Sequence, residues 1–194
     1  MNKNRLEAFS DGVIAIIITI MVLELKVPHN PTWQSYLDAY PIFVSYALSF
    51  VLVGLYWSNH HHLFHTVSKV NNKILWLNMF TLFWQSLIPF ATAAMGENSF
   101  TSIPVTVYAL LLVLAAVSYM FLVNALCSLH GANSAFYKAY KGHRTIYISM
   151  AVHTSAAIIS LIGFPKIAFT LIAVTVLLWF VPNHIISRNK PTEE

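Results

Sequence analysis

The chain has 194 residues, of which 57% are hydrophobic and only 9% are charged. A soluble globular domain carries about 25% charged residues, so this composition, with a mean hydropathy of +0.64, excludes a water-soluble fold and predicts an all-α integral membrane protein. The formal net charge of +4 does not indicate a nucleic-acid partner, because the basic residues flank apolar runs, where they meet lipid headgroups.

The first apolar segment is shorter than a membrane span requires. Gly12–Leu23 is uncharged, and at 1.5 Å per residue these residues cover about 18 Å of a hydrocarbon core about 30 Å thick. A helix that crosses here has to extend from Arg5 to Val27, with Asp11 and Glu24 near the membrane edges. Because charges at that depth face protein or water, we expect this helix inside an assembly.

Five further segments contain no Asp, Glu, Lys or Arg and are long enough to cross the bilayer as helices. Pro41, Pro104 and Pro165 lie near the starts of three of them, where a missing N–H costs least. Pro89 and Pro182 are expected to kink or end the helices in which they lie. We predict one six-helix transmembrane domain over residues 1–194, with spans at about 5–27, 41–65, 73–95, 103–129, 145–164 and 166–187.

The distribution of Lys and Arg predicts the orientation of these helices. Only Lys26 and Lys166 fall on one side of a six-helix arrangement. The remainder of the 11 basic residues fall on the other side: Lys3, Arg5, Lys69, Lys73, Lys138, Lys141, Arg144, Arg188 and Lys190. By the positive-inside rule the second side is cytoplasmic, so both termini are expected in the cytoplasm.

An apolar stripe follows the first predicted helix. At 100° per residue, Gly12, Ile16, Ile20 and Leu23 share one narrow face, with Thr19 on its border. Periodicity by itself favours ordinary helix–helix packing for such a stripe.

The start of the same helix carries a motif, Arg5-Leu6-Glu7-Ala8-Phe9-Ser10-Asp11-Gly12. Its pattern R-x-x-x-F-S-D resembles the signature of the lysosomal potassium channel family, the transmembrane protein 175 family. The continuation through Leu23-Glu24-Leu25-Lys26-Val27-Pro28 is similar to the prokaryotic members. Six spans with cytoplasmic ends fit one repeat of that family over the whole chain; the animal protein has two repeats.

The resemblance implies a potassium-selective channel, a homotetramer in the prokaryotic plasma membrane, with the first helix of each subunit lining a central pore. It assigns Ile16 to the constriction, Ile20 and Leu23 to the same face, and Thr19 to a position implicated in selectivity. A ring of aliphatic side chains can gate by dewetting. Glu24 either rings the outer pore mouth or pairs with Lys26. The expected partners are further copies of the chain, the bilayer and permeant potassium ions, with no cofactor and no metal.

The densest polar and aromatic cluster extends from Tyr56 to His65, at the cytoplasmic end of the second span. Asp11 and Ser10 are expected at the same depth, where an unpaired carboxylate is costly. We expect imidazole and tryptophan N–H groups of this cluster to bond to them, although the sequence leaves open which histidine does so. The predicted network comprises Arg5, Phe9, Ser10, Asp11, Trp57 and His61.

Two alternative functions fit parts of the sequence. A proton-coupled secondary transporter would use Asp11, Glu24 or the histidines, although no convincing inverted repeat is found. A haem or metal protein would use His61 and His65, which share a helix face but lack a second group of ligands. No enzyme motif is found, so catalysis is not expected.

Overall fold

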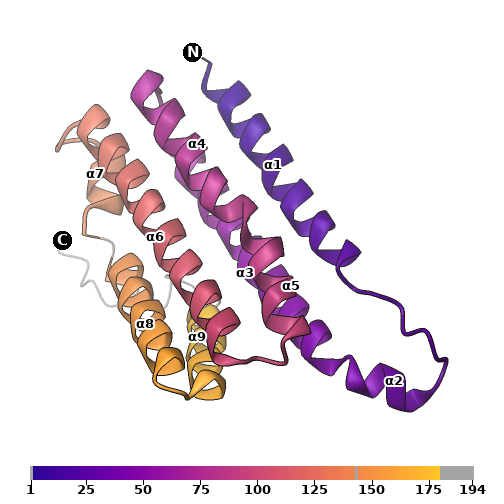
Figure 1. Cartoon of the computed structure of the whole chain (residues 1–194). Coiled ribbons are helices and arrows are strands. Elements are labelled where there is room, and N and C mark those ends of the chain that lie inside the picture. Colours follow the sequence, from indigo (N-terminus) through magenta and orange to yellow (C-terminus); the bar gives the residue numbers. More distant parts are fainter. Residues whose placement is uncertain (1, 143, 180–194) are drawn as a thin grey trace, which may run out of the picture.

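The computed structural model describes residues 2–142 and 144–179, and every regular element in this part of the chain is an α-helix (Figure 1). The helices of the described residues are α1 (Lys3–Leu23), α2 (Trp33–Asp38), α3 (Tyr40–His65), α4 (Asn72–Ser86), α5 (Ile88–Glu97), α6 (Ser102–His130), α7 (Ala135–Tyr140), α8 (Arg144–Leu161) and α9 (Pro165–Trp179). The prediction of an all-helical fold is confirmed.

Four segments of the described chain are long and apolar enough to cross a membrane. Three are the single helices α1, α3 and α6, and the fourth, Asn72–Glu97, consists of α4 followed by α5. Helix α8 has 18 residues, and α9 has a shorter apolar stretch, Pro165–Val176. The count of six spans stays a prediction, and the part of the sixth expected span at residues 180–187 lies outside the described residues.

Helix α1 ends at Leu23, whereas the predicted first span extended to Val27. Its last turn closes with short-range backbone bonds, in which the N–H groups of residues 24 and 25 donate to carbonyls three residues earlier. Beyond that turn, the Lys26 ammonium donates to the Glu97 carboxylate at the end of α5, and this bond raises the pKa of Lys26. The predicted end of the helix was wrong because the polar residues after Leu23 form turns and a tertiary ion pair.

The crossing segment Asn72–Glu97 is interrupted between α4 and α5. Pro89 occupies the first turn of α5, where its missing N–H leaves no helical bond unmade, and this confirms the expected break. Buried hydroxyls hold α5 in place after the break. Thr92 on α5 lies 2.7 Å from the hydroxyl of Ser49 on α3, which lies 2.8 Å from that of Tyr108 on α6.

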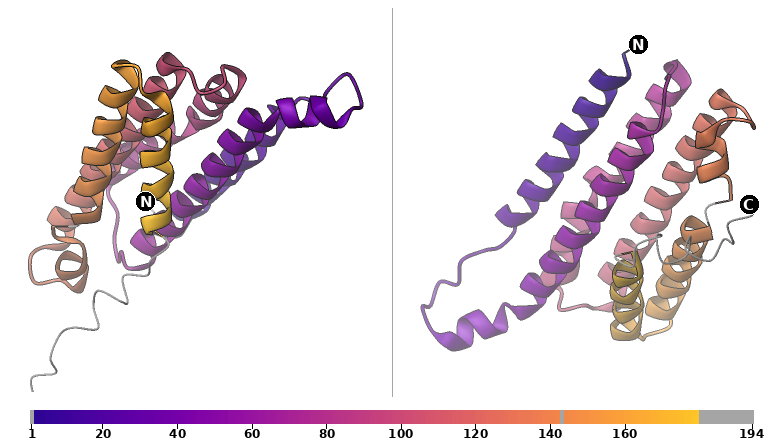
Figure 2. Two further views of the ribbon diagram at one scale, coloured as in Figure 1. Left: turned by 90° about the horizontal axis from the view of Figure 1, so that it is seen from below. Right: turned by 180° about the vertical axis from the view of Figure 1, so that it is seen from behind.

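The helices form an elongated bundle with α1 along one edge (Figures 1 and 2). Helix α1 packs against α3, α4 and α5, while α6, α8 and α9 pack together on the far side. The N-terminal end of α1, the α3–α4 connection and α7 lie at one end of the bundle, and α2 and the α8–α9 turn lie at the other (Figure 1). The basic residues at the start of α1, in the α3–α4 connection and in α7 thus lie at the end opposite Lys26 and Lys166, as the positive-inside argument requires.

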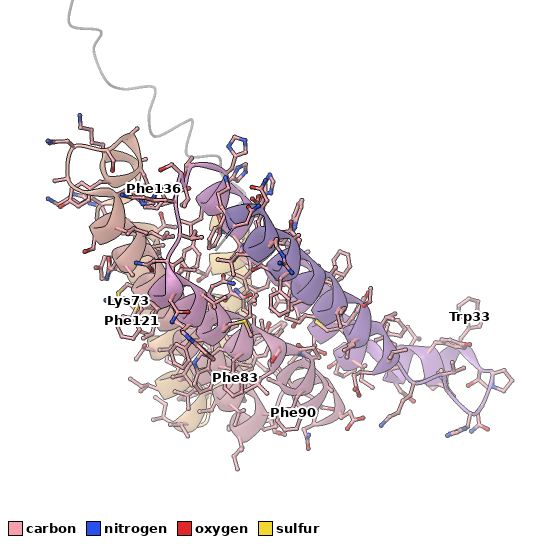
Figure 3. All side chains as sticks on the ribbon, turned by 90° about the horizontal axis from the view of Figure 1, so that it is seen from above. Trp33, Lys73, Phe83, Phe90, Phe121 and Phe136 are labelled. Atoms are coloured by element: carbon pink, nitrogen blue, oxygen red, sulfur yellow. The ribbon has the colours of Figure 1, made fainter. Side chains whose placement is uncertain are left out.

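Large apolar side chains cover the outside of the bundle. Phe83, Phe90 and Phe121 are all exposed, on three different helices (Figure 3). Trp33 is 87% exposed at the start of α2, which extends away from the other helices (Figure 3). A soluble protein rarely exposes so much apolar surface, so the bundle is suited to a surrounding of lipid.

Gly96 lies where α5 passes close to α3. A Cβ at this position would be 2.5 Å from Ser45 Oγ and 2.9 Å from the backbone Cα of Ile42. We expect Gly96→Ala to lower the free energy of unfolding by about 1–3 kcal/mol through overpacking, measured by thermal unfolding in detergent. Gly54→Ala is the matched control, because a Cβ there meets nothing within 4 Å. Equal unfolding midpoints for the two variants would contradict the close approach.

Candidate functional site

Helix α1 has one buried face and one uncovered face. The buried residues are Leu6, Ser10, Ile14, Ile17 and Met21, spaced three or four apart as one helix face requires. The contrast is sharp within a run of isoleucines: Ile14 and Ile17 are 0% and 3% exposed, whereas Ile16 is 57% exposed. The other described helices therefore cover one face of α1 and leave the other face exposed.

The uncovered face is the stripe that the sequence singled out. Gly12, Ile16, Thr19, Ile20 and Leu23 are all exposed, on the side of α1 opposite its buried residues. The Thr19 hydroxyl donates to the Ile16 carbonyl at 2.9 Å, so its oxygen keeps lone pairs directed away from the helix. The structure thus leaves an aliphatic surface with one hydroxyl layer largely exposed within the described chain.

A groove of about 760 Å³ runs between α1 and α5 beside this stripe. Ile16 and Ile20 form part of its apolar wall, with Phe90 on the α5 side. Glu24, Lys26 and Glu97 lie at its outer end. Lys26 forms its direct ion pair with Glu97, while Glu24 makes a weaker electrostatic contribution that also raises the pKa of Lys26.

Polar groups on the buried face of α1 bond to α4, and through α4 to α3. The Ser10 hydroxyl donates to the Leu6 carbonyl at 2.8 Å and accepts from Asn78 Nδ2 at 2.9 Å. The Asn78 Oδ1 atom lies 2.7 Å from His60 Nε2. Ser10, Asn78 and His60 are at most 1% exposed, so this chain of bonds is fully buried. It fixes the rotation of α1 about its own axis relative to α3 and α4.

A second, more exposed set of contacts flanks the first. Trp57 Nε1 on α3 donates to Asp11 Oδ1 at 3.0 Å. One turn later, His61 Nδ1 lies 3.3 Å from Glu7 Oε1, and the His61 ring stacks on Trp57 with 5.8 Å between ring centroids. These contacts join two turns of α1 to two turns of α3.

The structure corrects several details of the predicted network. Within the described residues no imidazole bonds to Ser10 or Asp11; His60 reaches Ser10 only through Asn78, and His61 contacts Glu7. Arg5 and Phe9 lie on the uncovered face of α1, with no hydrogen bond or ion pair to the described part of the chain. Sequence reasoning missed Asn78, although an asparagine in the middle of an uncharged span is a signal of a buried polar contact.

Comparisons with known proteins identify the family. A family model described as endosomal/lysosomal potassium channel TMEM175 matches residues 5–89, from the start of the motif to the first turn of α5. A protein from Chryseobacterium sp. (strain P1-3), named a potassium channel, is 44% identical over 189 residues, which cover 97% of this chain and 98% of the relative. The chain belongs to the TMEM175 family. The resemblance predicted from Arg5–Asp11 is confirmed.

Other TMEM175 relatives extend the likeness to the fold. A protein from Streptomyces collinus, named a potassium channel, is 34% identical over 128 residues, which cover 61% of this chain and 62% of the relative. The crystal structure of a lysosomal potassium-selective channel TMEM175 homolog from Chamaesiphon minutus matches with a TM-score of 0.80 at 25% identity, covering 92% of this chain and 96% of that one. These relatives are named as channels and not as enzymes.

Proposed function

We propose that the protein is a potassium channel that conducts passively through a central pore lined by α1. Its TMEM175 relatives in Chryseobacterium and Streptomyces are named potassium channels, and the matching solved structure is titled a potassium-selective channel. The observation that carries the proposal is the uncovered stripe of α1 in a chain of this family, since the bundle covers the other face of the helix. A plasma membrane location with both termini in the cytoplasm fits the distribution of basic residues.

We propose a homotetramer as the conducting form. One chain contributes one α1, and a single helix cannot surround an ion path. Cyclic symmetry closes a ring of identical subunits with one repeated interface. The positions of Arg5 and Phe9, on the same uncovered face as Ile16, support contacts between neighbouring subunits near the cytoplasmic end.

In such a ring, Ile16 forms the constriction and Ile20 and Leu23 extend the apolar wall towards the outside. A potassium ion loses part of its hydration shell there, and the aliphatic groups offer no ligands in exchange. The Thr19 oxygens are placed one turn from Ile16 to replace some of the lost water. Glu24, just outside the last turn of α1, would attract cations to the outer mouth.

Potassium efflux from liposomes that contain the protein tests the function. Purified protein should release trapped potassium down a potassium gradient alone, with sodium or an impermeant organic cation outside. The alternative, a proton-coupled transporter, would move potassium only together with a movement of protons across the membrane. Native mass spectrometry of the same preparation should give four copies, whereas a conducting monomer would overturn the pore arrangement.

Replacing Thr19 by valine tests the hydroxyl layer. The change preserves the shape of the side chain but removes an oxygen, so we expect the permeability of potassium relative to sodium to fall by roughly 2- to 10-fold, since one such contact is worth about 0.5–1.5 kcal/mol. Reversal potentials in mixed potassium and sodium measure the effect. Thr170→Val on α9 is the matched control, because that exposed hydroxyl also bonds to its own helix and lies far from α1 in the sequence. An unchanged reversal potential in Thr19→Val would remove Thr19 from the ion path.

A further inference from the structure

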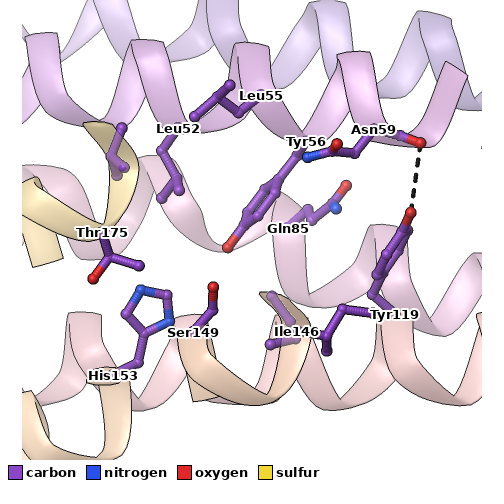
Figure 4. Close-up of a pocket in the computed structure, with 13 residues that line it drawn as sticks. Leu52, Leu55, Tyr56, Asn59, Gln85, Tyr119, Ile146, Ser149, His153 and Thr175 are labelled. Carbon is purple, nitrogen blue, oxygen red and sulfur yellow. Dashed lines mark hydrogen bonds between the residues drawn. The ribbon is translucent and has the colours of Figure 1, made fainter. Parts of the chain in front are cut away.

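A second polar site lies inside each subunit, away from α1. A cavity of about 50 Å³ is lined by residues of α3, α4, α6, α8 and α9, and no residue of α1 lines it. Its walls combine apolar side chains such as Leu52 and Ile146 with the polar side chains of Gln85 and His153 (Figure 4). The lining residues come from five helices, and Gln85 and His153 are both buried, so the site lies within the bundle rather than on its outer surface.

Buried polar atoms around this cavity lack partners. Among the residues that the structure describes, the two ring nitrogens of His153 have no hydrogen-bond partner. The Oε1 atom of Gln85 has none there either. Both side chains are 3% exposed. An unsatisfied buried polar group costs about 1–3 kcal/mol, so three such atoms beside one cavity require a ligand that can bond to them.

The chemistry of these groups restricts that ligand. A neutral imidazole has one donor and one acceptor nitrogen, and Gln85 Oε1 needs a donor. Thr175 donates its proton to the Leu171 carbonyl at 2.8 Å, so its oxygen offers only an acceptor to the cavity. Gln85 Oε1 and one imidazole nitrogen therefore call for donors, while the imidazole N–H calls for an acceptor. Water supplies both, whereas a lipid chain or another apolar molecule supplies neither.

The size of the cavity agrees with water. About 10–15 Å³ suffices for one molecule, so 50 Å³ accommodates roughly three or four. We propose that each subunit binds a small cluster of water molecules in this cavity, hydrogen-bonded to His153 and Gln85, at a site separate from the pore. Figure 4 shows the His153 ring directed towards Thr175 and Ser149, at the side of the cavity formed by α8 and α9. The inference does not depend on the proposed ion selectivity, because no pore residue takes part.

Solid-state NMR of the full-length protein in lipid bilayers tests the proposal without altering the site. With histidine ring nitrogens labelled, polarisation from water protons should reach the His153 ring, whose signals are identified by their loss in His153→Gln. His61, which is partly exposed, is the positive control. Transfer to His61 but not to His153 would overturn the proposal, since no water would then lie beside the His153 ring.

A double-mutant cycle supplies an independent measure. If water connects the two side chains, His153→Leu and Gln85→Leu should each lower the unfolding midpoint, and the double variant should lose less than the sum of the two shifts. Thr106→Val, which removes a hydroxyl bonded to its own helix, should add independently to His153→Leu. In a dry cavity, His153→Leu or Gln85→Leu would raise the unfolding midpoint, because each removes unpaired polar atoms. That result would overturn the proposal.

Discussion

Replacing Ile16 by phenylalanine is expected to lower potassium flux by roughly tenfold or more, which corresponds to about 1.4 kcal/mol or more added to the barrier. Ile16 is 57% exposed in the described part of the chain, so a larger side chain can be accommodated there without disturbing the subunit. In the proposed tetramer four phenyl groups would meet on the axis and occlude it. Potassium efflux from liposomes, normalised to the amount of assembled protein, measures the effect.

The opposite change at the same residue separates a pore from a packing surface. Ile16→Asn places amides in the ring, which should wet it, raise conductance and weaken the preference for potassium over sodium. Ile17→Asn is the matched control, because Ile17 is the neighbouring isoleucine and is 3% exposed. That variant buries an amide without a partner and should reduce the yield of folded protein. If Ile16→Asn also reduced folding and left selectivity unchanged, Ile16 would be a packing residue and the constriction would belong elsewhere.

Replacing Asn78 by leucine is expected to be among the most destabilising changes in the bundle. It leaves His60 Nε2 without its partner and removes the donor to Ser10, in surroundings where each unpaired neutral group costs about 1–3 kcal/mol. The folded, assembled fraction in detergent should fall, while the reversal potential of surviving channels stays that of the wild type. Ser86→Ala on the same helix removes an exposed hydroxyl and is expected to have little effect.

A second substitution tests whether the loss comes from the unpaired groups. Adding His60→Phe to Asn78→Leu removes the orphaned imidazole, so the double variant should be more stable than Asn78→Leu. A changed ion preference in Asn78→Leu at normal assembly would instead place the buried network in the permeation mechanism. Asp11→Ala should be milder than Asn78→Leu, because its partner Trp57 is 45% exposed and can bond to water.

Much of the fold and the family follow from local sequence features. Runs without charge define where helices can cross a bilayer, because an unpaired charge is costly there, and α3 and α6 begin and end within one residue of the predicted spans. The helical period of α1 brings Ile16, Thr19 and Leu23 to one face whatever the helix packs against. R-x-x-x-F-S-D is a contiguous pattern, so it indicates the family without any knowledge of tertiary contacts.

The tertiary structure decided which polar groups meet and which face of α1 stays open. Ser10 and Asn78 are 68 residues apart, and no local pattern links a serine on one helix with an asparagine on another. The pairing of Lys26 with Glu97, rather than with nearby Glu24, likewise depends on the end of α5 reaching the end of α1. Both faces of α1 are apolar in sequence, so hydrophobicity alone could not tell them apart. Packing against α3, α4 and α5 buries Ile14 and Ile17 and leaves Ile16 uncovered, because three helices on one side of α1 can cover only that side.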